Sequence, residues 1–153
     1  MKSRSRSGGP WWVYHADATD ATTKYLQLST TSATTTNSGN IWGSSLPTSS
    51  VFGFSVGAGK AHTQSETIVA YCFAPVAGFS AFGSFEATSS ATGPFIHTGG
   101  FRPRWIMVKN ADDTQYASAY AWTIVDTARY PHNEPAGDLN ALYANSSVDE
   151  NTY

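Results

Sequence analysis

The sequence predicts an all-β fold, an antiparallel β-sandwich of the jelly-roll or concanavalin-like type. Short runs of β-branched and aromatic residues recur along the chain, each closed by glycine, proline or serine and threonine clusters. This is the pattern of successive strands joined by tight turns. Aromatic residues make up 14% of the chain, and serine with threonine roughly a quarter, a mixture typical of strand-rich extracellular or virion surfaces rather than helical enzymes.

Length and charge limit the class further. The 153 residues are the size of one domain, long enough to bury a core. Charged residues are only 13% and the net charge is −2, so neither a nucleic-acid footprint nor a membrane-surface patch is indicated. No stretch approaches the ~18 apolar residues that span a bilayer. The single cysteine, Cys72, excludes an internal disulfide and a multi-thiolate metal site. No cofactor is expected, and stability must come from packing, from partner chains, or from both.

In the first part of the chain, three aromatic or alternating runs are expected to form strands: residues 11–15, 25–28 and 51–56. Residues 29–40 are nearly all serine, threonine, asparagine and glycine, which predicts a loop or a solvated edge strand. Ile41-Trp42-Gly43 interrupts this polar stretch. We expect it to anchor the loop to the core.

The stretch from Glu66 to Asn110 is expected to organise the fold. It holds four strand-like pieces, at residues 66–74, 78–85, 93–97 and 101–110. Residues 122–126 predict a further strand, and residues 142–147 close the patterned part of the chain.

A diverged internal repeat is indicated within this single predicted domain of residues 1–153. Three pieces recur in the same order: Met1-Lys-Ser with Val108-Lys-Asn, Trp12-Val-Tyr-His with Trp122-Thr-Ile-Val-Asp, and Tyr25-Leu-Gln-Leu with Leu142-Tyr-Ala-Asn. On this hypothesis residues 1–77 resemble the second half of one repeat unit and residues 78–153 the first half of the next. An open sheet edge then results, to be completed by the chain's own tail or by strand exchange between subunits. The alternative is chance similarity between short aromatic strands.

The run from Ile68 to Phe85, with Gly93-Pro-Phe-Ile-His and Gly100-Phe-Arg-Pro-Arg-Trp-Ile-Met-Val-Lys, resembles the repeating domain of tail-fibre and other virion proteins of tailed bacteriophages. The resemblance covers most of the chain from about residue 12 to residue 150. It implies a lectin-like, laminin-G-like β-sandwich with a structural or adhesive role on the virion. The partners it implies are copies of the chain, other virion proteins and a host cell-surface glycan. The matching motifs consist of strand and turn residues and carry no reaction.

Sugar rings stack on exposed aromatic side chains while nearby amide and carboxylate groups bind their hydroxyls. One loop-rich cluster has this composition: Tyr116, Tyr120, Tyr130, Asp112, Asp113 and Asn133. These residues are the candidate glycan contacts. The alternative hypothesis for the function is accordingly a carbohydrate-binding module that recognises a host glycan. The competing explanation is that the tyrosines pack against the sandwich edge or another subunit. A capsid decoration protein is a further alternative.

Other chemical motifs are weaker. Gly53-Phe-Ser-Val-Gly57 matches the G-x-S-x-G pattern of a hydrolase elbow, with Ser55 as its nucleophile, but that elbow needs a helix and the residues after it form a poor one. We therefore expect no catalytic residue. The four histidines have no metal-ligand spacing, and Asp112, Asp113 and Asp138 lack the alternating ligands of a calcium loop. No metal site is predicted.

Overall fold

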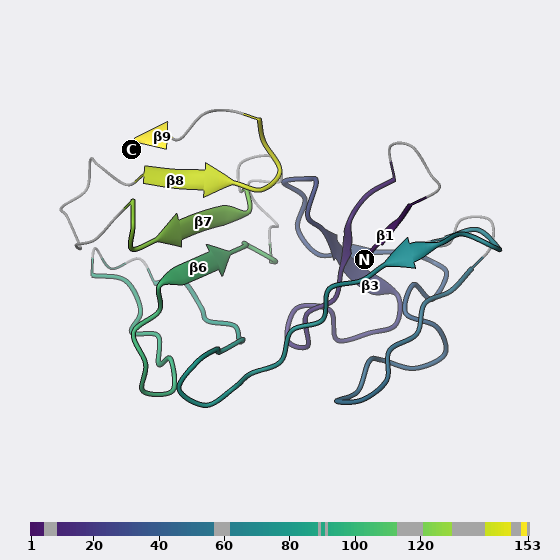
Figure 1. Cartoon of the computed structure of the whole chain (residues 1–153), viewed down its shortest axis with the longest axis horizontal. Coiled ribbons are helices and arrows are strands. Elements are labelled where there is room, and N and C mark those ends of the chain that lie inside the picture. The colour runs from purple at the N-terminus through teal and green to yellow at the C-terminus, as the bar shows by residue number, and fades with distance from the viewer. Residues whose placement is uncertain are drawn as a thin grey trace.

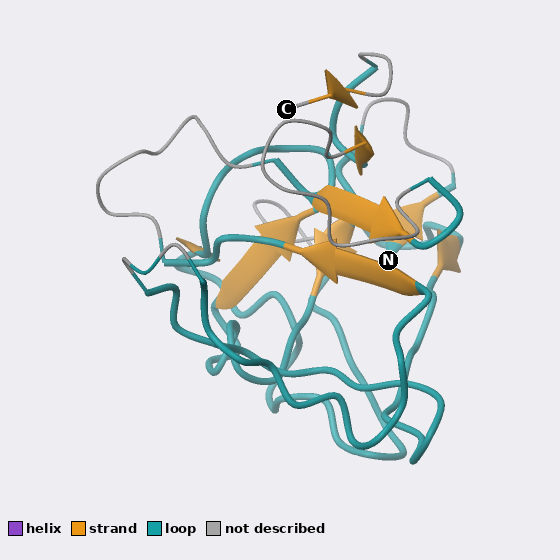
Figure 2. Ribbon diagram, turned by 90° about the vertical axis from the view of Figure 1, so that its left-hand side faces the viewer, coloured by secondary structure: helices purple, strands orange, loops and turns teal. Residues whose placement is uncertain are grey.

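The computed structural model describes residues 1–4, 9–56, 62–88, 90, 92–112, 121–129 and 140–147, together with the backbone of residues 151–152. Within these residues the chain forms nine short β-strands and no helix. The ladders between named strands are all antiparallel. Figure 2 shows the strands gathered in one half of the molecule and long connections filling the other. The predicted all-β class with antiparallel sheets is therefore confirmed.

The N-terminal part forms two small sheets. One has the strand order β2 (Trp12–Val13), β3 (Lys24–Gln27), β4 (Thr35–Thr36). The other pairs β1 (Lys2–Ser3) with β5 (Ile68–Val69). β4 is the solvated edge that the polar composition of residues 29–40 allows, since its threonines bury little apolar surface.

The core packs against the β2–β3–β4 sheet. Ile41 is fully buried and Trp42 is 3% exposed, with Met1, Trp12, Tyr14 and Tyr25 packed around them. The indole Nε1 of Trp42 donates a 2.7 Å hydrogen bond to the backbone oxygen of Lys24, which fixes the buried ring against β3. The predicted anchoring role of Ile41-Trp42 is therefore confirmed.

The C-terminal part forms one sheet in the order β6 (Trp105–Val108), β7 (Thr123–Asp126), β8 (Asn140–Tyr143), β9 (Asn151–Thr152), which Figure 1 shows beside the N-terminal strands. β6 lies at its outer edge. Trp122, which precedes β7, is 7% exposed, and Ala141 of β8 is fully buried.

The two parts are joined at the end of β3 and the loop that follows. Trp122 Nε1 donates to the backbone oxygen of Gln27 at 2.9 Å, and Lys109 Nζ donates to the backbone oxygen of Thr31 at 2.6 Å. A backbone bond from Thr34 to Ala111 adds a third link.

The β2–β3–β4 sheet and the β7–β8–β9 sheet share one pairing pattern. Trp12 and Val13 face Gln27 and Leu26, as Thr123 and Ile124 face Tyr143 and Leu142. The outer ladders match too, because Lys24 and Tyr25 face Thr36 and Thr35, while Asn140 and Ala141 face Thr152 and Asn151. Two further backbone hydrogen bonds correspond. The bond from the Leu28 N–H to the Trp11 oxygen matches the bond from Ala144 to Trp122. The bond from the Thr30 N–H to the Gln27 oxygen matches the bond from Ser146 to Tyr143. The strand pairing aligns Trp11 with Trp122 and Leu26 with Leu142. The repeat predicted from the sequence aligned Trp12 and Tyr25 with these two residues, so the two alignments differ by one residue.

Several predicted strands are absent from the described residues. Residues 51–56 supply only the bridge of Val56 to His62, and residues 66–74 pair only at Ile68–Val69. Residues 78–85 and 93–97 form no strand, and Ser80 makes only an isolated bridge to Val76. The expectation that the stretch from Glu66 to Asn110 organises the fold is wrong, because the buried core lies elsewhere. β-Propensity favours an extended backbone, but a strand forms only where a second strand completes its hydrogen bonds.

Candidate functional site: an exposed apolar segment

The predicted glycan cluster falls largely outside the described residues. Tyr116, Tyr120, Tyr130, Asp113 and Asn133 are not among them. Asp112 is described: its side chain is exposed, and its backbone N–H donates a 3.0 Å bond to Asn110 Oδ1. The cluster therefore stays a prediction.

The serine of the elbow-like motif holds a backbone position in the fold. The Ser55 N–H donates a 2.9 Å bond to the backbone oxygen of Ile41, so the residue fastens its segment to the core. The neighbouring His62 is 1% exposed, lies edge-on to the Phe54 ring and has its Nδ1 3.4 Å from the Glu66 carboxylate. A general base must reach substrate, and burial of this imidazole opposes that role. A nucleophile elbow needs a helix directly after the serine; residues 57–61 lie outside the described residues, and residues 62–66 form no helix.

The remaining histidines and acidic residues that the structure describes do not gather. Among the described residues, no group of three histidine, cysteine, aspartate or glutamate side chains could hold a metal ion. His15 Nδ1 accepts the N–H of Asp17, and His97 Nδ1 accepts the N–H of Gly99, so both rings serve local turns. His132, Asp113 and Asp138 lie outside the described residues.

The pKa values of the Met1 amino group and the Asp20 carboxyl are displaced, and both shifts have local causes. Burial lowers the pKa of the Met1 amino group, an effect that the nearby Cys72 opposes. This amino group donates a 2.6 Å bond to the backbone oxygen of Trp12. A hydrogen bond from Lys24 lowers the pKa of the exposed Asp20 carboxyl.

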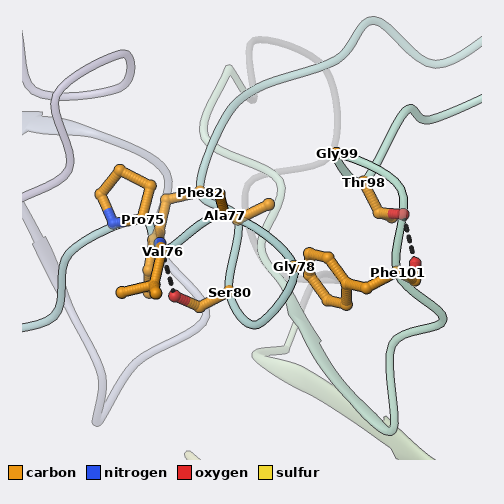
Figure 3. A pocket seen from close by; sticks show the side chains of 10 residues that line it. Pro75, Val76, Ala77, Gly78, Ser80, Phe82, Thr98, Gly99 and Phe101 are labelled. Carbon is orange, nitrogen blue, oxygen red and sulfur yellow. Dashed lines mark hydrogen bonds between the residues drawn. The ribbon is translucent and has the colours of Figure 1, made fainter.

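One open depression of about 250 Å³ lies where two loops meet, and Figure 3 shows its lining. The lining is apolar or small: Pro75, Val76, Ala77, Gly78, Ser80, Ala81, Phe82, Thr98, Gly99 and Phe101. Its two hydroxyl groups are committed to turns, because Ser80 Oγ donates to the Ala74 oxygen at 2.9 Å and Thr98 Oγ1 donates to the Phe101 oxygen at 2.6 Å. The depression offers apolar contact and carries no acid, base or free nucleophile.

Most of this lining belongs to a stretch of the chain with many exposed apolar side chains, the apolar segment (residues 70–97). Phe73 and Phe79 are each 79% exposed, and Phe95 is fully exposed. Phe73 and Phe82, far apart in the loop, lie with their ring centroids 6.2 Å apart. The other large exposed side chains of this segment are Tyr71, Val76, Phe85 and Ile96.

The backbone of the apolar segment is as open as its side chains. Between described residues, its backbone hydrogen bonds occur only in the turn from Val76 to Ser80 and from Gly93 to Ser90. Buried or half-buried N–H and C=O groups require partners. Any process that covers these aromatic rings must therefore also supply hydrogen bonds, as a neighbouring strand does.

The size and charge of this surface fit a protein interface. A fully exposed aromatic side chain presents about 150–250 Å², so the six aromatic residues of the segment expose on the order of 900 Å². A standard interface covers ~800 Å² on each partner. Glu86 is the one Asp, Glu, Lys or Arg between Thr67 and Phe101. Depletion of charge is the compositional mark of an interface centre.

Sequence reasoning placed these aromatic residues inside strands and missed their exposure. A signal was available in their spacing. Phe79, Phe82 and Phe85 recur every third residue, whereas the side chains on one face of a strand recur every second residue. An extended chain with this spacing directs successive rings to opposite faces, so a single sheet face cannot bury them all.

No helix in the described part of the chain is long and apolar enough to cross a membrane. Comparison with known proteins found no match among the curated proteins and none among the solved structures. A family model does match, and it covers residues 1–153. The chain belongs to the family described as domain of unknown function DUF7483.

Proposed function

We propose that this protein is a non-enzymatic structural component of a tailed-phage virion, acting through the association of subunits. The observation that carries the proposal is the apolar segment, where exposed aromatic rings coincide with a backbone that has few internal hydrogen bonds. Such a surface is costly to leave in water and prone to association. The resemblance of residues 68–108 to virion repeat domains supports a location on the virion.

The absence of a convergent reactive group at the depression supports a binding role over a catalytic one. Its lining contains no titratable side chain, and its two hydroxyl groups donate to backbone oxygens. The catalytic alternative rests on Ser55, which is held by a backbone bond beside a buried histidine. Attachment to a host glycan, through Tyr116, Tyr120 and Tyr130, is the adhesive part of the proposal.

Electron microscopy of the purified chain tests the proposal. We expect regular particles or fibres, and we expect Phe73→Ser with Phe79→Ser to abolish them, because both rings are 79% exposed. Val51→Ser is a matched control, since Val51 is 67% exposed but lies outside the apolar segment. Particles that persist in the double variant, or that disappear equally in the control, would contradict the role of the segment.

A further inference from the structure

The pairing pattern that the β2–β3–β4 and β7–β8–β9 sheets share also includes the strand next to β2 and the strand next to β7. Met1 and Trp12 exchange two backbone hydrogen bonds, of 2.6 and 2.9 Å, and Val108 faces Thr123 at the corresponding place. Because Trp12 corresponds to Thr123, Met1 corresponds to Val108. The next residues along then correspond as well, Lys2 with Lys109 and Ser3 with Asn110. The residues that correspond to β1 therefore directly follow β6 in the chain. β6 and these residues together occupy the strand position that β1 occupies in the N-terminal part.

β1 has a strand on its outer side. Lys2 faces Val69 and Ser3 faces Ile68, and the Arg4 N–H donates a 2.8 Å bond to the Thr67 oxygen. In the C-terminal sheet the corresponding outer side belongs to β6, which is an edge strand of the described sheet. The same register therefore predicts which residues of a β5-like strand would face β6.

The backbone groups of β6 that point outward follow from its bonds to β7. The Thr127 N–H donates a 3.0 Å bond to the Arg104 oxygen. Hydrogen-bonded and non-hydrogen-bonded residues alternate along an antiparallel pair, so Ile106 and Val108 also bond toward β7. Trp105 and Met107 consequently present their backbone groups to the open side.

A strand suited to this edge exists in the chain. Residues 70–73 continue directly from β5, beyond its pairing with β1, and they make no backbone hydrogen bond to another described residue. Tyr71 is 69% exposed and Phe73 79% exposed. On β6, Trp105 is 55% exposed and Ile106 46% exposed. Both surfaces are apolar, extended and open.

We propose that residues 70–73 of one copy of the chain add as an antiparallel strand to the outer edge of β6 in a second copy. The register carried over from β1 and β5 places four pairs opposite one another: Ala70 with Val108, Tyr71 with Met107, Cys72 with Ile106, and Phe73 with Trp105. This inference rests on the proposed function, since it names the partner and the contact through which subunits assemble.

The contact has a defined symmetry. One copy uses its β5 extension and the other its β6 edge, so the first chain keeps a free β6 edge and the second keeps a free β5 extension. Such a head-to-tail interface gives a ring when the rotation closes and a filament when it does not.

Disulfide trapping between two single-cysteine chains tests the register. Cys72 is the only cysteine and is exposed, so the natural chain supplies one partner. The other is Ile106→Cys combined with Cys72→Ser. Opposed residues in a non-hydrogen-bonded antiparallel pair have their Cα atoms ~4.5 Å apart, within the range of about 4.4–6.8 Å that a disulfide bridges. Mixing the two chains under mild oxidation is expected to give a mixed disulfide dimer, which a size tag on one chain distinguishes on a non-reducing gel.

Met107→Cys with Cys72→Ser is the matched control, because the adjacent side chain points to the opposite face of the strand. We expect at least tenfold less mixed dimer with it. As an independent test of the same register, Met107→Cys is mixed with Tyr71→Cys, both in the Cys72→Ser background, and this pair is expected to link. Equal trapping at positions 106 and 107, or trapping in neither pair within material that light scattering shows to be assembled, would overturn the register alone. Chains that remain monomeric at every concentration would overturn both the register and the proposed function.

Discussion

Trp122 donates a hydrogen bond from its indole nitrogen to the backbone oxygen of Gln27, at 2.9 Å, across 95 positions of sequence. Gln27 ends β3 and Trp122 precedes β7, so this bond joins the N-terminal and C-terminal sheets. The Trp122 side chain is 7% exposed. One residue thus supplies both apolar burial and a directional contact at the junction.

Replacing Trp122 separates these two contributions. Trp122→Phe keeps an aromatic ring but removes the indole donor, so that the part-buried Gln27 oxygen keeps only the longer bonds from Thr30, at 3.3 and 3.4 Å. We expect a loss of about 1 kcal/mol in the free energy of unfolding. Trp122→Ala also removes the buried ring and should cost about 3 kcal/mol or more. Urea unfolding followed by circular dichroism measures both. Val51→Ala, at a 67% exposed position, should stay within about 0.5 kcal/mol. An equal loss in the phenylalanine and alanine variants would show that ring burial contributes nothing.

Gly43 tests the turn that follows the buried Trp42. Its φ is +85°, while an added Cβ would meet no atom closer than 3.7 Å. The cost of Gly43→Ala therefore comes from the left-handed backbone, about 1–2 kcal/mol. Gly83→Ala is the control, since Gly83 has no positive φ and a Cβ there would lie 3.9 Å from an Asp17 oxygen. We expect that change to be neutral or to stabilise by up to about 1 kcal/mol. Thermal unfolding of the two variants side by side compares them directly.

The Met1 amino group predicts a pH dependence of stability. Burial lowers its pKa below 8.0 in the folded chain, so the unfolded chain binds this proton more tightly. The free energy of unfolding should therefore rise as the pH increases from below the folded pKa toward about 8, and level off above it. The comparison is with an N-terminally acetylated chain, whose stability should lack this rise. Parallel curves for the two chains between pH 6 and about 9 would contradict the assignment.

The glycan hypothesis can be tested separately from assembly. If Tyr116, Tyr120 and Tyr130 stack on sugar rings, changing all three to alanine should remove binding on a glycan array, because stacking supplies much of the apolar contact. Tyr14→Phe is a suitable control, since that ring packs edge-on against Trp42 in the core. An array without hits for the natural chain, or binding unchanged in the triple variant, would rule out this role for the cluster.

The hydrolase alternative is tested by chemical labelling. We expect a fluorophosphonate probe to leave Ser55 unlabelled, because an activated serine requires an accessible base and His62 is 1% exposed. Ser55→Ala supplies the blank for mass spectrometry of the labelled peptides. Labelling that vanishes in this variant would establish a reactive serine.

Local sequence patterns predicted the parts of the fold whose partners lie close by. β2 and β3 arise from short aromatic and alternating runs joined by a polar turn, and Trp42 was recognisable as an anchor because it interrupts a long polar stretch. β7 likewise lies within its predicted run, residues 122–126. In each case apolar periodicity and the neighbouring turn carry the information.

The apolar segment could not be predicted in the same way. Residues 78–85 and 93–97 have the composition of strands, yet the described residues among them form no strand, and Ser80 makes only an isolated bridge to Val76. Composition states that a segment can be extended, whereas pairing depends on a partner that the local sequence does not identify. The same holds for the link between Trp122 and Gln27, since neither residue carries a local sign of the other.

Sedimentation velocity of the purified chain across a wide concentration range tests the central claim most directly. If other copies cover the apolar segment, the natural chain should sediment as multimers, and the combined Phe73→Ser and Phe79→Ser variant should sediment as a folded monomer. A natural chain that remains monomeric at every concentration, with its apolar segment uncovered, would contradict the account.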